Sequence, residues 1–90
     1  MIKVKDAMTA KQADAFFAII KSIETVGYPP TLNELSEVLK VSYTSARTRV
    51  STLVKKGYLK KTKHIKRGIE PVEGIQEIVH KQRNKREANI

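Results

Sequence analysis

The 90-residue sequence predicts a mainly α-helical domain with a small β-hairpin and an extra C-terminal helix. Three observations predict this fold class. Three stretches carry apolar residues three and four positions apart and each begin at a capping residue, which is typical of amphipathic helices. Only three residues separate the second stretch from the third, as in a helix-turn-helix. Two short strand-like segments follow, and the order helix, helix, helix, hairpin is that of a winged helix-turn-helix.

The first helix is expected over residues 10–26, after an N-terminal arm formed by residues 1–8. Thr9-Ala-Lys-Gln12 matches a capping box, in which the Thr hydroxyl and the Gln side chain satisfy backbone N–H groups of the first turn. Gly27 provides the left-handed cap that ends the helix. The aromatic residues assigned to the core by default are Phe16, Phe17 and Tyr58.

The second helix is expected over residues 32–39, directly after Pro29-Pro30, which block continuation of the first helix. Thr31-Leu-Asn-Glu34 is a second capping box. The short amphipathic stripe of this helix consists of Leu35, Val38 and Leu39.

The third helix is expected over residues 43–56, with Ser42 as its N-cap and Gly57 at its end. Its apolar residues form one stripe, while the opposite side carries short hydroxyls and a guanidinium without any acid. The major groove of a duplex admits one α-helix, and such side chains suit its base edges. The residues of that side are Tyr43, Thr44, Arg47, Thr48, Ser51 and Lys55.

A hairpin is expected after Gly57, with residues 58–63 and 69–72 on either side of a turn. Pro71 restricts the second strand to a sheet edge. The turn is basic and forms the wing, whose tip would lie along phosphates or enter the minor groove. Alternatively, its lysines only protect an exposed hairpin edge. The wing residues are Lys63, His64, Lys66 and Arg67.

Residues 73–90 form a last segment, expected as a short helix with a basic tail. Its apolar stripe, at helical spacing, would pack either on the first helix or against the same helix of a second subunit. We expect a homodimer at least on DNA, because duplex specificity usually comes from two half-sites about 10 bp apart. The segment is thus a candidate for dimerisation or for a protein partner. The stripe consists of Ile75, Ile78 and Val79.

The positive charge is concentrated in one part of the chain. The net charge is +9, and residues 40–68 contain ten Lys or Arg and no acid, whereas the flanking parts are nearly neutral. A positive block inside a balanced chain indicates a surface that faces a polyanion, and nucleic acid is the expected partner. The alternatives are a membrane surface, an acidic protein and simple solvation.

The composition argues against several other functions. The chain has no cysteine, and His64 and His80 lie far apart without an acidic cluster, so neither a metal site nor a cofactor is expected. No constellation supports catalysis, and we expect no enzyme. We also expect a cytoplasmic protein, because no signal peptide and no membrane span is apparent.

The residues expected at DNA divide into base readers and backbone contacts. Arg47 is the best candidate for a bidentate contact to guanine, and Thr44 and Thr48 could pack methyl groups on thymine. Ser42 and Thr31 are expected first as helix caps, whose neighbouring N–H groups can also bind phosphate. The complete set is Thr31, Ser42, Tyr43, Thr44, Ser45, Arg47, Thr48, Ser51, Lys55, Lys63, His64, Lys66 and Arg67.

Four segments of the sequence resemble the N-terminal DNA-binding domain of LexA-type repressors, over about residues 8–72. The second of these segments is the most specific. The segments are Met8-Thr-Ala-Lys-Gln12, Gly27-Tyr-Pro-Pro-Thr-Leu-Asn-Glu-Leu35, Leu53-Val-Lys-Lys-Gly-Tyr-Leu59 and Arg67-Gly-Ile-Glu-Pro71.

This resemblance implies a winged helix-turn-helix that binds DNA. Its base-reading positions would fall at Ser42, Thr44, Ser45, Arg47 and Thr48. The turn before the third helix is one residue shorter here and the reading residues differ in type, so the family's target sequence is not implied. The self-cleaving serine–lysine domain of those repressors is expected to be absent, together with the dimerisation surface that it supplies.

The expected function is therefore sequence-specific binding of double-stranded DNA by a transcription regulator, a repressor of phage or bacterial origin. The alternative is a protein-interaction winged helix that acts as an adaptor of a host regulator or polymerase. RNA binding is a third option. A stacking platform for single strands needs exposed aromatic residues beside basic ones, and Tyr43 alone is expected to qualify.

Overall fold

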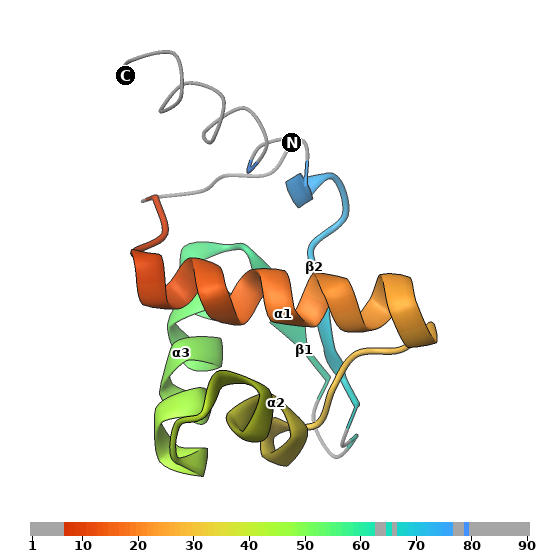
Figure 1. Cartoon of the computed structure of the whole chain (residues 1–90). Helices are drawn as coiled ribbons and strands as arrows, with labels where there is room; N and C mark the ends of the chain where they lie inside the picture. The colour runs from red at the N-terminus through yellow and green to blue at the C-terminus, as the bar shows by residue number, and fades with distance from the viewer. Residues whose placement is uncertain (1–6, 63–64, 66, 77–78, 80–90) are drawn as a thin grey trace, which may run out of the picture.

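The computed structural model describes residues 7–62, 65, 67–76 and 79. Three helices and one two-stranded antiparallel sheet follow one another along the chain, so the predicted winged helix-turn-helix is confirmed (Figure 1). The elements are α1 (Ala10–Val26), α2 (Leu32–Leu39), α3 (Tyr43–Lys56), β1 (Leu59–Lys61) and β2 (Ile69–Pro71).

Both predicted capping boxes form. The Thr9 hydroxyl accepts from the Gln12 N–H at 3.2 Å, and the Gln12 side chain accepts from the Thr9 N–H at 3.1 Å. The corresponding distances between Thr31 and Glu34 are 3.1 and 2.9 Å. These reciprocal bonds satisfy N–H groups that have no partner within the helix. They explain why α1 and α2 begin at the residues that the sequence indicates.

The hairpin is shorter than predicted. Leu59 lies opposite Pro71 and Lys61 lies opposite Ile69, so each strand has three residues. Beyond Lys61 the Thr62 N–H still donates to the Gly68 carbonyl at 3.0 Å, but the chain then turns. A side chain at residue 68 would collide with backbone, because its Cβ would lie 2.8 Å from the Thr62 carbonyl oxygen.

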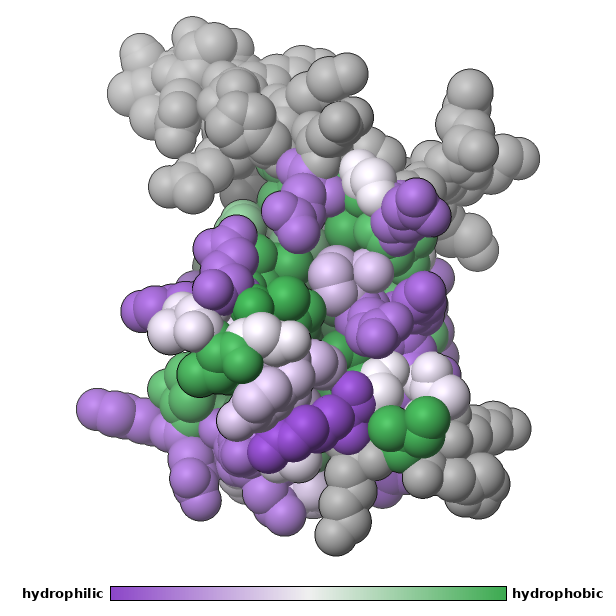
Figure 2. All heavy atoms as spheres, turned by 90° about the vertical axis from the view of Figure 1, so that its right-hand side faces the viewer, coloured by the Kyte–Doolittle hydropathy of each residue, from purple (hydrophilic) through white to green (hydrophobic). Residues whose placement is uncertain are grey.

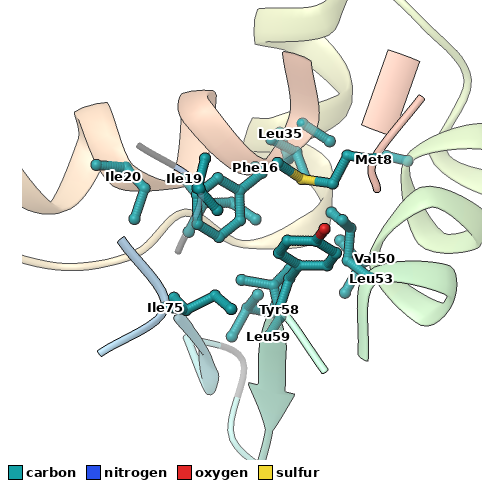
Figure 3. Close-up of a cluster of buried hydrophobic side chains, with 14 residues drawn as sticks. Met8, Phe16, Ile19, Ile20, Leu35, Val50, Leu53, Tyr58, Leu59 and Ile75 are labelled. Atoms are coloured by element: carbon teal, nitrogen blue, oxygen red, sulfur yellow. The ribbon is translucent and has the colours of Figure 1, made fainter. Parts of the chain in front are cut away.

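The core lies between α1, α3 and the hairpin, and Leu35 adds α2 to it. The Phe16 and Tyr58 rings meet edge to face near its centre, with centroids 6.0 Å apart (Figure 3). Both side chains are buried, so this contact joins α1 to the start of the hairpin. The buried residues are Met8, Ala15, Phe16, Ile19, Ile20, Leu35, Ala46, Val50, Leu53, Tyr58, Leu59, Ile69, Ile75 and Val79.

Four apolar residues that the helical stripes placed toward the interior are in fact exposed: Phe17, Val26, Val38 and Val54. Phe17 is 40% exposed, because adjacent helical residues point about 100° apart and Phe16 takes the direction of the core. Val38 is 68% exposed, because α2 contacts the rest of the domain along one narrow side. The core assignment of Phe17 was therefore wrong, and Tyr28 is a further exposed aromatic residue.

The segment after the hairpin packs on its own chain. Ile75 is completely buried and Val79 is 5% exposed, both within the same core cluster as Phe16. The sequence left open whether this stripe packs on the first helix or on a second subunit, and these two residues pack into the core that α1 helps to form. Ile78, most of the expected C-terminal helix and its basic tail lie outside the described residues. Homodimerisation stays a prediction, and Ile75 and Val79 offer no surface for it.

The turn between α2 and α3 depends on a lysine in a conformation that favours glycine. Lys40 has φ 57° and ψ 44°, and its N–H donates to the Glu37 carbonyl at 3.2 Å. Because the left-handed conformation costs an L-residue about 1–2 kcal/mol, we expect Lys40→Gly to raise the free energy of unfolding by about 0.5–1 kcal/mol once the entropy of glycine is subtracted.

Urea unfolding with an unchanged m-value is the appropriate measurement. Gly57→Ala is the matched control, because Gly57 ends α3 with φ 90° and should lose stability by a similar amount. A Lys40→Gly protein no more stable than the unaltered one would contradict this account of the turn.

Candidate nucleic-acid interface

The outer side of α3 is an exposed polar surface. Burial of Ala46, Val50 and Leu53 fixes the rotation of the helix about its axis. The residues on the opposite side are consequently exposed, and α3 contains no acid. The predicted set that the structure brings together here is Tyr43, Thr44, Arg47, Thr48, Ser51 and Lys55.

The N-terminus of α3 is held by hydroxyl groups. The Ser42 hydroxyl accepts from the Ser45 N–H at 3.1 Å, as a helix cap should, and donates to the Ser45 hydroxyl at 3.1 Å. The capping role predicted for Ser42 is therefore confirmed, as is that of Thr31 at α2. Contact of either residue with phosphate stays a prediction.

A groove of about 600 Å³ separates the hairpin from the helix-turn-helix. The N-terminal end of α2 forms one side with Thr31 and Asn33, and Tyr43 continues this side at the start of α3. Lys61, Thr62 and Ile65 form the other side. Hydroxyl, amide and ammonium groups thus line an open channel between the two elements that were predicted to contact DNA.

The alternation of β1 decides which of two neighbouring lysines faces this groove. Lys61 lies opposite the buried Ile69, on the inner face of the hairpin, and lines the groove. Lys60 lies on the outer face opposite Glu70, and its ammonium is 3.6 Å from that carboxylate. Because successive strand residues point to opposite faces, Lys61 is the one of these two neighbouring lysines that can approach a ligand in the groove.

Arg67 follows the turn of the hairpin but is bound to the helix-turn-helix. Its Nη1 and Nη2 donate to the two carboxylate oxygens of Glu34 at 2.6 and 2.9 Å. Nη1 also donates to the Pro29 carbonyl at 3.0 Å, and the guanidinium carbon lies 4.5 Å from the centre of the Tyr28 ring. We call this group of four residues the wing clamp. Figure 2 shows the side of the molecule that faces right in Figure 1, where purple hydrophilic side chains lie between green apolar ones.

The charges of the wing clamp reinforce each other. Hydrogen bonds from Arg67 and then from the Thr31 N–H lower the pKa of Glu34 from 4.5 to about 2. The same contact with Glu34 raises the pKa of Arg67. A lowered carboxyl pKa contributes stability above the ordinary value and loses it as the pH falls toward 2. The ion pair is therefore complete at neutral and mildly acidic pH.

Lys56 makes a second contact of the same kind. Its ammonium donates to the Gln12 side chain at 2.7 Å and to the Ala7 carbonyl at 3.2 Å. Gln12 and Glu34 occupy the same position in their capping boxes, and each binds a cation from a distant part of the chain. Among the basic residues of 40–68 that the structure describes, Lys56, Lys60 and Arg67 are thus engaged within the protein.

Comparison with known proteins identifies the family. A family model described as the LexA DNA binding domain matches residues 5–68. The chain belongs to this family. The LexA repressor of Oleidesulfovibrio alaskensis is 37% identical over 65 residues, which cover 72% of this chain and 31% of that protein. Those of Citrifermentans bemidjiense and Magnetococcus marinus are each 38% identical, over 71% and 76% of this chain and 32% and 29% of their own length.

The resemblance to LexA-type DNA-binding domains is therefore confirmed. This chain spans about a third of the length of the LexA repressors that it matches. No group of three or more His, Asp or Glu able to hold a metal ion occurs in the described part of the chain. Nor does any helix there have the length and apolar character needed to cross a membrane.

The individual DNA contacts expected of this LexA-type domain stay predictions. Lys63, His64 and Lys66 lie outside the described residues. Arg67 is described, and the structure pairs its partly exposed guanidinium with Glu34 of α2. Physical reasoning on the sequence could not foresee this contact, because the two residues are 33 positions apart and no local pattern links them.

Three polar residues that line the groove, Asn33, Lys61 and Thr62, were absent from the predicted set. Lys61 could have been chosen over Lys60, because Ile69 marks the inner face of the hairpin once the register is known. Asn33 had no such signal, because it reaches the groove only through the packing of α2 beside the hairpin.

Proposed function

We propose that the chain is a sequence-specific double-stranded DNA-binding transcription regulator, a repressor of phage or bacterial origin. The observation that carries this proposal is the acid-free outer side of α3, which is exposed along its whole length beside a groove lined by Lys61. Membership of the LexA DNA-binding domain family and similarity to proteins named LexA repressor support it.

In this proposal α3 enters the major groove, and one DNA strand follows the channel between the helix-turn-helix and the hairpin. Arg47 lies one helical turn after Tyr43 on the same flank of α3, so both side chains face the strand from one direction. Arginine can donate two hydrogen bonds to guanine, whereas Lys55 and Lys61 suit phosphates. The residues Thr44, Thr48 and Ser51 then face the base edges.

The experiment is selection of bound duplexes from a random pool, followed by mobility-shift titration of the selected duplex and a shuffled one over a salt series. We expect tighter binding of the selected duplex and a linear fall of log K with log salt, with a slope of about −0.9 per phosphate contacted. A symmetrical selected site would in addition indicate two bound copies.

Absence of duplex binding above background at low salt would contradict the proposal. Equal affinity for the selected and shuffled duplexes would contradict sequence specificity. Retention of a partner protein after nuclease treatment, without duplex binding, would instead favour the adaptor function. Preference for single-stranded RNA over duplex DNA would favour an RNA-binding role.

A further inference from the structure

We infer that Arg67 is a positioning residue, which acts through Glu34 to hold the hairpin at a set distance from α2 and thereby sets the width of the groove. The inference rests on the proposed function, because the groove is taken as the path of a DNA strand. It changes the role of Arg67, which the sequence alone assigned to the DNA-contacting wing.

The guanidinium is already bound on several sides. Both terminal nitrogens donate to Glu34, one of them also to the Pro29 carbonyl, and Tyr28 covers one face. These bonds use three of the five N–H donors of the guanidinium and fix its orientation, so the side chain can swing toward a phosphate only if at least one of them breaks. A bidentate pair with a carboxylate is among the stronger hydrogen-bonded contacts in proteins, so exchange for a phosphate brings little gain.

The bound partners belong to the helix-turn-helix and not to the hairpin. Glu34 is in the first turn of α2, and Tyr28 and Pro29 belong to the α1–α2 connection (Figure 1). That connection is itself fixed, because the Ser22 hydroxyl of α1 donates to the Tyr28 carbonyl at 2.9 Å. The wing clamp therefore ties the hairpin to α1 and α2 together.

The buried residues of β1 and β2 hold the base of the hairpin, and the wing clamp adds a contact beside its turn. Three residues in each strand provide few ladder hydrogen bonds, and an isolated two-stranded hairpin is at best marginally stable. The backbone beside Arg67 is closely packed, since the Gly68 N–H donates to the Ile65 carbonyl at 3.2 Å and no Cβ fits at Gly68. Restraint at Arg67 is therefore transmitted to Thr62 and Ile65, which line the groove.

The clamp also removes a charge conflict. Glu34 is an acid in the first turn of α2, and its chain neighbour Asn33 lines the groove in which phosphates would run. Because Arg67 pairs with this acid, Glu34 can cap the helix without repelling the DNA backbone. Removal of the Glu34 charge should therefore change the affinity for duplex DNA in opposite directions under the two possible roles of Arg67. If Arg67 positions the hairpin, binding weakens; if Arg67 contacts phosphate, its release from Glu34 leaves binding unchanged or tighter.

Glu34→Gln and Arg67→Gln are the variants, alone and together, with the selected duplex as probe. Glutamine retains the capping box, as Gln12 shows in α1, so Glu34→Gln removes the charge while preserving the start of α2. We expect each single variant to bind about threefold to tenfold more weakly, and the double variant to bind no more weakly than either one. Arg67→Lys should not restore binding, because lysine cannot form the bidentate pair.

Amide hydrogen exchange of the DNA-free protein provides a second measurement. The N–H groups of Thr62 and Gly68 donate within the hairpin turn, and we expect both to exchange faster in Glu34→Gln and in Arg67→Gln. Unchanged exchange in both variants would overturn the inference, as would a Glu34→Gln protein that binds duplex as tightly as the unaltered chain. Failure of the proposed function is distinguishable, because the unaltered chain would then bind no duplex. The hydrogen-exchange measurement, which needs no DNA, would still test whether the wing clamp holds the hairpin.

Discussion

Replacement of Phe16 by alanine is expected to lower the free energy of unfolding by about 3–5 kcal/mol. The side chain is 1% exposed and lies against Tyr58 at the centre of the core. A domain of this length has a total stability of roughly 5–13 kcal/mol, so the loss is a large share of it. The cavity would form where α1, α3 and the hairpin meet, and no neighbouring element can close it.

Phe17→Ala is the matched control for this prediction. Phe17 follows directly in the same helix and its ring lies 5.5 Å from that of Phe16, but it is 40% exposed. Its removal should cost at most about half as much, because less apolar area leaves the interior. Chemical denaturation of both variants with a common m-value tests the pair. Equal losses, or a larger loss for Phe17→Ala, would contradict the orientation of α1.

Replacement of Arg47 by alanine is expected to reduce discrimination between the selected and a shuffled duplex by about 1–3 kcal/mol, a factor of roughly 5 to 150. The exposed guanidinium lies on the acid-free side of α3, where a base edge can accept two hydrogen bonds. Competition titrations with single-position variants of the selected site should show the lost preference at one base pair. Arg47→Lys should restore charge but not the bidentate contact.

The two lysines of β1 serve as controls for that assignment. Lys61→Ala should weaken binding to all duplexes alike and reduce the magnitude of the salt slope by about 0.9, because one phosphate contact is lost. Lys60→Ala, on the outer face and paired with Glu70, should leave the slope unchanged. If Arg47→Ala and Lys61→Ala had the same effect on every duplex, the division between base reading and backbone contact would be wrong.

The sequence was sufficient for features that depend on neighbouring residues. Helix limits follow from contacts three or four positions apart, so the two capping boxes, Ser42 and the glycines that end α1 and α3 predicted the bounds of all three helices. The spacing of buried residues likewise predicted the outer side of α3. The concentration of basic residues in 40–68 indicated where a polyanion would bind.

The position of each basic side chain was decided only by the tertiary structure. The count of basic residues does not distinguish Lys60 from Lys61, but the strand register places Lys60 beside Glu70 and Lys61 in the groove. The same holds for Arg67 and Lys56, which reach acceptors 33 and 44 residues away in the two capping boxes. A long-range ion pair forms when packing brings two chain segments together, and no local pattern encodes that proximity. The sequence by itself therefore determined the helices and the acid-free outer side of α3, because both depend on residues a few positions apart. The tertiary structure decided which basic side chains pair with other parts of the chain and which line the groove.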